Sequence, residues 1–349
     1  MLDFRSDYTC GMHPEVLKAL ADANGRRETG YGADTLSAAA AERIRAACDA
    51  PEAAVYFLCG GTQVNAVALD GLLNKGEGVL SADHAHIYTH EAGAIEALGH
   101  KVLGDSSRLS QTDKLRANIL FLFCRDFYAD ESHAHMVAPG AVYLSQPDEM
   151  GNLYSLEELT EIRRVCDDFH MRLYVDGARL AYALASPDND VTLPDLARLC
   201  DAFTIGGTKC GAAFGEALVL KNEATVPHFE TLAKRRGALL AKGRMIGAQF
   251  LALFTNGLYT RIGQAGNRRA KTVLAELRMR ELPCRYAPTN QVFFHVNRAQ
   301  YDYLKERVLF STWENRLDGL NDATLRLVTD WATEDADVEA LCGVLREMP

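Results

Sequence analysis

The sequence has no cysteine pair with CxxC spacing, no long apolar run and no long run of basic residues. No stretch approaches the roughly 18 apolar residues that a membrane span needs, and the start, MLDFRSDYTC, lacks the apolar core of a secretion signal. The nine cysteines are an odd number and lie singly along the chain. This pattern argues against a disulfide framework or a zinc ribbon and favours a reducing compartment. We therefore expect a cytoplasmic protein without a membrane partner.

The charge balance argues against nucleic acid as a partner. Thirty-seven basic and 47 acidic residues give a net charge of −10, whereas a protein that binds the phosphate backbone is expected to be basic. The 349 residues are 48% hydrophobic and 24% charged, without repeats, low-complexity segments or a Pro/Ser-rich linker. Such a chain is long enough for one large α/β enzyme of two unequal domains.

Short β-branched or aromatic runs alternate with longer helical patterns as far as about residue 250. This alternation predicts right-handed crossovers and a mainly parallel sheet that is buried on both faces. After residue 250 the pattern changes to a smaller α+β arrangement, so we expect a large domain over 1–250 and a small one over 251–349. The first residues are expected to pack with the small domain. Strands are predicted within 54–62, 77–83, 100–105, 117–123, 140–146, 171–180, 201–211, 216–222, 290–296 and 323–331, and helices at 63–73, 155–169, 268–283 and 335–348.

Residues that directly follow such strands are the candidates for chemistry, because ligands bind at the carboxyl ends of the strands in open α/β sheets. The first candidate is the turn Cys59–Thr62, CGGT, which leads from a strand into a helix. Its glycines let the backbone approach an anion and the helix start offers free N–H groups. An ordinary tight turn is the alternative, and the GxGxxG and P-loop nucleotide motifs are absent.

The second candidate is His86, just past the strand over 77–83. An imidazole can stack on a flat cofactor ring or move protons near neutral pH. His84 and His90 lie close by in the sequence, so a metal centre is an alternative, as is a surface or packing role.

Asp176 and Lys209 are the third and fourth candidates. A carboxylate that ends a buried strand needs a partner, and Arg179, three residues on, is one possibility. Lys209 lies in the glycine-flanked turn IGGTKCG, where it suits a Schiff-base nucleophile, although a surface lysine is the alternative.

Together these residues form the set that pyridoxal phosphate requires. The cofactor needs an anion cradle, a residue that stacks on its ring, a carboxylate for the pyridine nitrogen and a lysine for its aldehyde. The turn at 59–62 and the residues His86, Asp176 and Lys209 match these needs in turn.

At this point the sequence resembles the threonine aldolase branch of the fold-type I pyridoxal phosphate enzymes, along nearly its whole length. The motifs that carry the resemblance are FRSDYT, GYGADT, FLCGGTQVNAVAL, HIYTHEAGAIEALGHKV, VYLSQPDEMGNLYSLEEL, LYVDGARLAYAL, IGGTKCGAAFGEA and LRLVTDWAT. The resemblance implies a large domain with a mainly parallel seven-stranded sheet and a small α+β C-terminal domain.

The resemblance also implies roles for the cofactor-binding residues. Lys209 forms the internal aldimine and Asp176 pairs with the pyridinium nitrogen. His86 stacks on the ring and takes part, directly or through water, in removing the substrate hydroxyl proton. Gly60, Gly61 and Thr62 hold the phosphate, and Arg179 lies beside the cofactor as well.

Further positions match substrate contacts and contacts between subunits. Arg179 and Arg326 match arginines that grip the substrate carboxylate, and Ser6 lies close to the substrate. Arg244 matches a residue that reaches a neighbouring subunit's cofactor, and Tyr31 lines a shared site. The resemblance therefore implies a homo-oligomer, a dimer or tetramer; the alternative for the stretch around Arg244 is a basic, solvated helix.

Two positions depart from the relatives. Gly60 stands where serine is common, and Asp148 stands where threonine is usual. The Asp148 carboxylate is either a new group near the pocket or a loop residue.

The implied reaction is cleavage of a β-hydroxy-α-amino acid, threonine or allo-threonine, to glycine and an aldehyde. A β-eliminating lyase that releases ammonia and a keto acid is the nearest alternative. A non-catalytic ligand-binding protein of the same fold and a metal hydrolase on the three histidines are the others.

Overall fold

The computed structural model describes residues 1–104, 114–286, 288–315 and 322–349. The strands are β1 (Leu2–Asp3), β2 (Ala54–Leu58), β3 (Glu77–Leu80), β4 (Val102–Leu103), β5 (Ala138–Ser145), β6 (Arg172–Asp176), β7 (Ala202–Gly206), β8 (Glu216–Leu220), β9 (Gln291–Asn297), β10 (Val308–Leu309), β11 (Ser311–Asn315) and β12 (Asp322–Val328). The helices are α1 (Pro14–Asn24), α2 (Thr35–Ala47), α3 (Gly61–Leu72), α4 (His86–Thr89), α5 (Ala117–Ala129), α6 (Leu156–Asp168), α7 (Leu180–Leu184), α8 (Leu193–Leu199), α9 (Phe229–Arg235), α10 (Arg244–Leu253), α11 (Leu258–Met279), α12 (Arg298–Lys305) and α13 (Asp335–Glu347).

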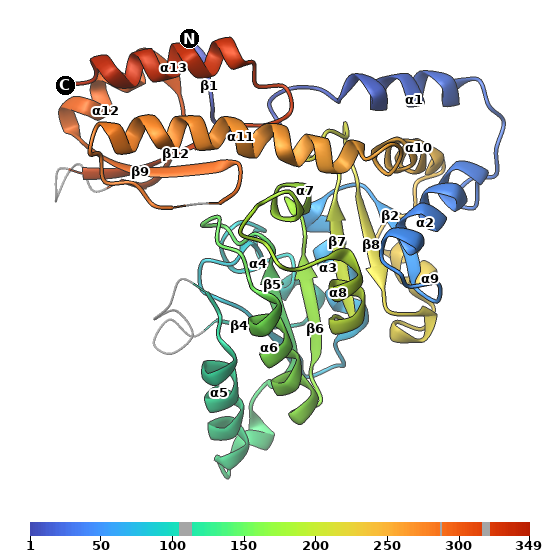
Figure 1. Cartoon of the computed structure of the whole chain (residues 1–349). Coiled ribbons are helices and arrows are strands. Elements are labelled where there is room, and N and C mark those ends of the chain that lie inside the picture. The colour runs from blue at the N-terminus through green and yellow to red at the C-terminus, as the bar shows by residue number, and fades with distance from the viewer. Residues whose placement is uncertain (105–113, 287, 316–321) are drawn as a thin grey trace.

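A seven-stranded sheet in the order β2-β8-β7-β6-β5-β3-β4 forms the centre of the larger part of the molecule (Figure 1). Strand β8 runs antiparallel to both of its neighbours, and the other four pairs are parallel. The predicted fold class, a mainly parallel seven-stranded sheet with a smaller C-terminal α+β part, is confirmed.

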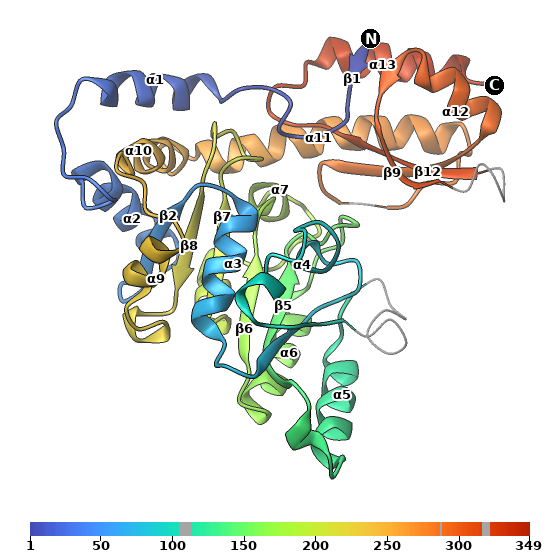
Figure 2. The ribbon, with the colours of Figure 1, turned by 180° about the vertical axis from the view of Figure 1, so that it is seen from behind.

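Helices cover both faces of this sheet, with α6 and α8 on one side and α3 on the other (Figures 1 and 2). Alternate residues of β5 point to opposite faces of the sheet and pack into the two hydrophobic cores that the helices cover. Val142 and Leu144 belong to the core under α6, whereas Ala141 and Tyr143 belong to the core under α3. A strand buried on both faces reads as a continuous apolar run, which is why the sequence predicted it.

The predicted strand over 117–123 is wrong, because these residues begin helix α5. Leu120 and Cys124 are its buried residues, and their spacing of four places both on one face of a helix. The run ANILFLF contains a single β-branched residue, and a short apolar run has no periodicity that separates a strand from a buried helix. Of the predicted strand over 100–105, residues 102–103 form β4, and residue 105 lies outside the described residues.

The C-terminal part contains an antiparallel sheet in the order β11-β12-β9, packed under α11 and α13. The chain start joins this part, since β1 pairs in parallel with β10 and Phe4 lies in its core. The expected boundary at 250/251 falls inside α10 and stays a prediction. Helix α11 contributes Leu258 to the core of the large part and Val273 to the small core.

The carboxyl ends of the five parallel strands and of β2 meet at the edge of the sheet nearest to α11. Ser145, at the end of β5, lies opposite Asp176, at the end of β6. Glu216, at the start of β8, lies between Gly206 of β7 and Leu58 of β2. Residues that are far apart in the sequence are thereby gathered at one place. No helix in the described ranges is long and apolar enough to cross a membrane.

Candidate active site

A pocket of about 560 Å³ opens at this edge of the sheet, and a smaller one of about 40 Å³ adjoins it. The predicted residues that line the larger pocket are Gly60, Gly61, Thr62, His86, Arg179, Lys209 and Arg326. Asp176 lines the smaller pocket, together with Lys209 and Arg179. The structure thus brings together residues from both ends of the chain that the sequence selected separately.

Lys209 follows β7 in the turn that leads to β8. Burial lowers the pKa of its amine, and the nearby Arg179 guanidinium lowers this pKa further, against the opposite effect of Asp7, Asp176 and Glu216. An amine with a lowered pKa has more of its nucleophilic, unprotonated form at neutral pH. The surface-lysine alternative does not describe this position.

Asp176 ends β6 and is buried, with four hydrogen-bond donors around its carboxylate. Oδ2 accepts from Asn65 Nδ2 at 2.8 Å and from the Tyr143 hydroxyl at 2.7 Å. Oδ1 accepts from the backbone N–H of Ala178 at 2.8 Å and from Thr204 Oγ1 at 3.5 Å. Arg179 is not its partner, so these donors explain how the buried carboxylate is held.

A hydrogen-bonded chain connects Asp176 to His86. Asn65 donates to Asp176 and also, at 2.8 Å, to Oε1 of Glu91. The same Glu91 oxygen lies 2.8 Å from Nδ1 of His86. Tyr174 donates to the Asn65 carbonyl oxygen at 2.8 Å, which fixes the orientation of this amide. Neither Asn65 nor Glu91 was among the predicted site residues, although both lie in motifs that carried the resemblance.

The turn before α3 leaves open space for a ligand. A Cβ atom built on Gly60 or Gly61 would have no atom within 4 Å, and α3 has no side-chain cap at its start. The free N–H groups of its first turn and the Thr62 hydroxyl line the pocket, so this end of the helix can receive an anion.

Arg179 forms a two-pronged ion pair with Asp7. Its Nε and Nη2 donate to the two Asp7 oxygens at 2.7 and 3.0 Å, and Asn290 donates to Asp7 at 2.9 Å. Asp7, a residue that the sequence analysis did not select, therefore orients the guanidinium. Because Asp7 is fully buried, its partner Arg179 is what keeps its pKa low against burial.

Arg326 and Ser6 carry unused hydrogen-bonding groups beside this pair. Arg326 Nη1 and Nη2 donate to Gln291 and Ser311, but its buried Nε has no partner among the described residues. The buried hydroxyl of Ser6 likewise has none in the part of the chain that the structure describes, and Ser6 is not among the residues that line either pocket. Burial and the neighbouring Arg179 lower the pKa of Arg326 to about 10, so it is still charged at neutral pH.

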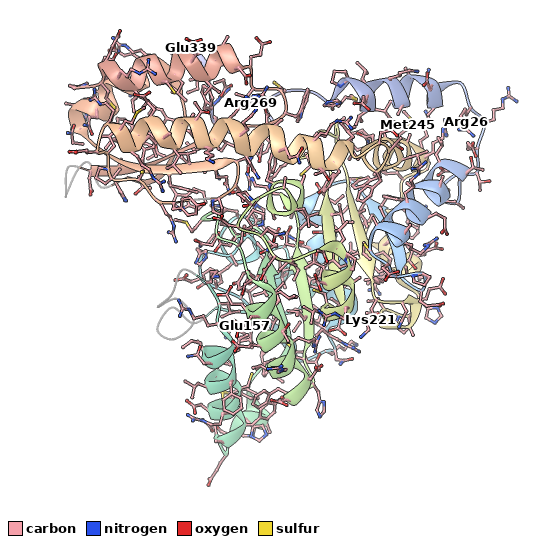
Figure 3. The ribbon with its side chains drawn as sticks, in the orientation of Figure 1. Arg26, Glu157, Lys221, Met245, Arg269 and Glu339 are labelled. Atoms are coloured by element: carbon pink, nitrogen blue, oxygen red, sulfur yellow. The ribbon has the colours of Figure 1, made fainter. Side chains whose placement is uncertain are left out.

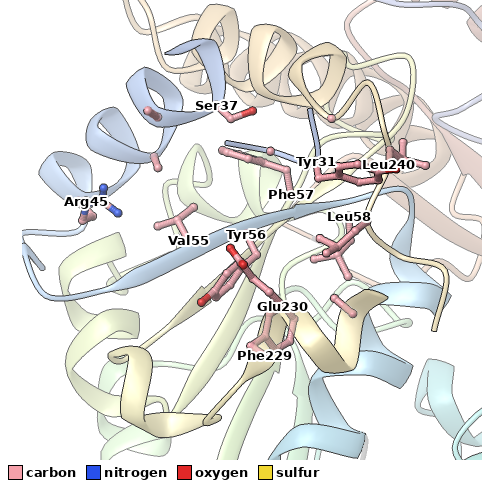
Figure 4. Close-up of a pocket in the computed structure, with 16 residues that line it drawn as sticks. Tyr31, Ser37, Arg45, Val55, Tyr56, Phe57, Leu58, Phe229, Glu230 and Leu240 are labelled. Carbon is pink, nitrogen blue, oxygen red and sulfur yellow. The ribbon is translucent and has the colours of Figure 1, made fainter. Parts of the chain in front are cut away.

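Tyr31 and Arg244 do not line the pocket that holds Lys209 within this chain. Tyr31 instead lines a separate pocket of about 180 Å³, with Phe57, Leu240 and other side chains (Figure 4). Lys234 lies with its amine 4.0 Å from the centre of the Tyr31 ring. Arg244 begins α10 and its buried Nε has no partner among the described residues. Their predicted roles at a neighbouring subunit's site stay predictions.

Asp148 lies in the loop after β5, and its side chain holds that loop although the residue also lines the smaller pocket. Oδ1 accepts from the backbone N–H groups of Met150 and Asn152, and Oδ2 from the Asn152 side chain. Burial raises its pKa to about 6. Its oxygens are used to hold the turn after β5.

Two further carboxylates in the larger pocket were not among the predicted site residues. Glu149 follows Asp148 and its Oε1 accepts from the backbone N–H of His86 at 2.9 Å and from Ser145 Oγ at 2.8 Å. Glu216 accepts from the backbone N–H of Gly207 at 2.7 Å, and burial raises its pKa to about 7. Both lie in motifs that carried the resemblance, VYLSQPDEMGNLYSLEEL and IGGTKCGAAFGEA, and this was the available signal.

The metal alternative finds no geometric support. Across the described ranges, no three His, Cys, Asp or Glu side chains are grouped so as to hold a metal ion. His84 lies 3.3 Å from Asp83, and the Nδ1 atom of His86 is engaged by Glu91.

Comparison with known proteins agrees with this site. The sequence profile described as "Beta-eliminating lyase" matches residues 3–299. The chain belongs to the β-eliminating lyase family.

Within this family the similar proteins carry one kind of name. A low-specificity L-threonine aldolase of Pseudomonas aeruginosa is 31% identical over 274 residues, which cover 78% of this chain and 77% of the relative. One from Pseudomonas sp. is 28% identical over 98% of this chain and 96% of its own length. A solved Leishmania major threonine aldolase superposes with a TM-score of 0.93, at 38% identity and 99% coverage of both chains.

The fold is that of fold-type I pyridoxal phosphate enzymes. A histidinol-phosphate aminotransferase of Clostridium acetobutylicum, only 12% identical, shares it over 99% of this chain with a TM-score of 0.73. This lyase is a pyridoxal phosphate enzyme, and its residues fit the cofactor. A half-buried lysine with a lowered pKa and an open anion-binding turn line the larger pocket, and a fixed carboxylate lines the smaller pocket that adjoins it.

Proposed function

We propose that this β-eliminating lyase family member cleaves a β-hydroxy-α-amino acid, threonine or allo-threonine, to glycine and an aldehyde. The observation that carries the proposal is a pair of buried donors that have no partner among the described residues: Arg326 Nε in the pocket of Lys209, and Ser6 Oγ, next in the chain to Asp7, the ion-pair partner of Arg179. Buried donors without a partner are uncommon and costly, and an amino-acid carboxylate would satisfy both. The names of the two Pseudomonas relatives and of the Leishmania major protein support the choice of substrate.

The charges around these donors favour an anionic group. Asp7 balances Arg179, but Arg326 has no acidic partner within ion-pair distance among the described residues. One positive charge is therefore left over in a largely buried place. A substrate carboxylate on Arg326, Ser6 and the remaining face of Arg179 would neutralise it through charge-assisted hydrogen bonds.

The remaining residues prepare the pocket for the cofactor. Lys209 supplies the amine that attaches the cofactor aldehyde, and Asp176, held by Asn65 and Tyr143, supplies the carboxylate for the ring nitrogen. When bound, pyridoxal phosphate supplies the sink that accepts the electron pair of the breaking Cα–Cβ bond. His86, anchored by Glu91, would lie against the ring of the bound cofactor, and Gly60, Gly61 and Thr62 would hold its phosphate.

We further propose that the enzyme is a cytoplasmic homotetramer whose active sites are shared between subunits. The scattered cysteines, none of which is bonded to another, suit a reducing compartment. Arg244 and Tyr31 match positions of the family that reach a partner's site, and both lie outside this chain's own pocket. We propose neither a membrane nor nucleic acid as a partner.

Product analysis of the cofactor-loaded enzyme tests the reaction. L-Threonine and L-allo-threonine should each give acetaldehyde and glycine in equal amounts, because the bond between Cα and Cβ breaks. Ammonia and a 2-oxo acid in place of these products would mean β-elimination and would overturn the proposal.

A further inference from the structure

The proposed substrate brings three polar groups into the pocket, and two of them already have partners. Its amino group goes to the cofactor at Lys209, and its carboxylate goes to Arg179, Arg326 and Ser6. The third group, the β-hydroxyl, must lose its proton as the aldehyde forms, so an acceptor is required close to it.

Glu149 has the geometry of such an acceptor. It lines both the larger and the smaller pocket. Its Oε1 is held by two fixed donors, the backbone N–H of His86 and the hydroxyl of Ser145. Its other oxygen, Oε2, has no hydrogen-bond donor among the described residues, and the carboxylate is paired with neither arginine of the pocket. One oxygen therefore positions the group and the other is available to a ligand.

The other groups in the larger pocket that could accept a proton are Glu216, His86 and His90, and each is held by contacts of its own. Glu216 receives the N–H of Gly207 and lies opposite Gly206, under the lysine turn. Nδ1 of His86 is bound to Glu91, which fixes the ring. The ring of His90 lies between those of His86 and Trp313, at centroid distances of 5.8 and 6.1 Å.

We infer that Glu149 is the base that takes the proton of the substrate β-hydroxyl, a role that the sequence had assigned to His86 or to water. This inference rests on the proposed function. The O–H proton moves to the Glu149 carboxylate, and the O–H electron pair becomes the second bond of the aldehyde C=O. The Cα–Cβ bond breaks, its electrons stay with the glycine fragment, and Cα later takes up a proton. Glu149 then returns its proton to solvent.

The substitution Glu149→Gln tests this inference with little disturbance of the structure. The amide has nearly the same shape, and its Oε1 can still accept from His86 and Ser145, but it cannot take a proton. We expect kcat for threonine cleavage to fall by roughly 100-fold or more. The exchange of the glycine Cα proton with solvent deuterium needs no β-hydroxyl, so it should stay within about threefold of wild type. The absorption of the bound cofactor should not change.

The control is Glu157→Gln, the same change on the exposed face of α6 (Figure 3). It should leave cleavage and exchange as they are. Equal losses of cleavage and exchange in Glu149→Gln would overturn the inference, because they would mean that Glu149 only positions the pocket. Unchanged cleavage would overturn it too.

Two further outcomes separate the alternatives. If His90→Asn loses cleavage and keeps exchange while Glu149→Gln keeps both, the base is His90 and the inference is wrong. Wild-type enzyme that exchanges glycine protons but releases no aldehyde from either threonine isomer would overturn the proposed function itself, and the hydroxyl step with it.

Discussion

Asp7 and Arg179 are the residue pair on which substrate binding depends in this account. Because the pair is buried and two-pronged, Asp7→Asn removes the charge that balances Arg179 and loosens its orientation. We expect the free energy of unfolding to fall by about 3 kcal/mol and KM for the amino acid to rise more than kcat falls. Urea unfolding and steady-state kinetics measure both quantities. Asp22→Asn, which breaks an exposed pair with Lys18, is the control, and an unchanged KM in Asp7→Asn would contradict the assignment.

Glu216 predicts a pH dependence of stability. Burial raises its pKa from the ordinary 4.5 to about 7, so between these values the folded chain binds more protons than the unfolded chain. The contribution of Glu216 to stability is therefore lost as pH rises from 4.5 to 7. The side chain of Glu216→Gln does not titrate. The free energy of unfolding of this variant, relative to wild type, should therefore increase by up to about 3 kcal/mol as pH rises from 4.5 to 7. Urea unfolding of both proteins at pH 4.5, 6 and 8 measures the difference, and a difference independent of pH would contradict this.

At the residue scale, the sequence selected side chains whose type fits the cofactor and missed those that hold them. Lys209, Asp176 and His86 were found because each directly follows a predicted strand and belongs to a known chemical set. Asn65, Glu91 and Asp7 were missed, because an amide on a helix or a carboxylate near the chain start gains its role only from contacts across more than 25 residues. Whether Asp148 serves the pocket or its loop also depended on hydrogen bonds that no spacing predicts.

The contact between helices α7 and α11 determines where Arg179 lies, since Arg179 is the residue that precedes α7. A Cβ atom at Gly263 of α11 would lie 2.0 Å from the carbonyl oxygen of Ala181, so the helices must separate to admit it. Gly263→Ala should lower the free energy of unfolding by roughly 3 kcal/mol and raise KM. Gly343→Ala in α13 is the matched control, because its Cβ meets no atom within 4 Å and should stabilise the protein by up to about 1 kcal/mol. Equal melting temperatures of the two variants would contradict this.

Helices and strands were predictable where the hydrophobic pattern was long or where capping residues marked the ends of the element. Helix α6 has a capping box of Ser155 and Glu158 and a regular buried face, and it was predicted to within one residue at each end. Helix α5 was mistaken for a strand, because its first seven residues are nearly all apolar. The short strands β1 and β10 could not be predicted, since two paired residues carry no periodicity.

At the scale of the whole molecule, the central sheet followed from the alternation of strands and helices, but the antiparallel insertion of β8 between β2 and β7 did not. The order of strands depends on long-range packing, and the resemblance implied only seven strands and their mainly parallel direction. The packing of the first residues against the C-terminal part was expected (Figures 1 and 2), and it brings Asp7 to Asn290, whose side chain donates to it.

Shared active sites predict complementation between inactive chains. Lys209→Ala and Arg244→Glu should each be inactive alone, but chains of the two variants assembled together should recover up to about a quarter of wild-type activity. Half of the randomly mixed dimers contain one chain of each variant, and one of the two active sites in such a dimer is intact. Activity after joint refolding measures this. A mixture of Lys209→Ala and Asp176→Ala should recover nothing, since both residues belong to one chain's pocket. Mixed assemblies of the first pair without activity would contradict shared sites.

The most direct test of the central claim compares two lysines in the same assay. Lys209 is in the pocket, whereas Lys221 follows β8 and is exposed at the far end of that strand (Figure 3). Acetaldehyde and glycine released from L-threonine are measured with pyridoxal phosphate in excess. We expect Lys209→Ala to release neither product and to keep its fold by circular dichroism, while Lys221→Ala should match wild type. Cleavage by Lys209→Ala at the wild-type rate would contradict the central claim.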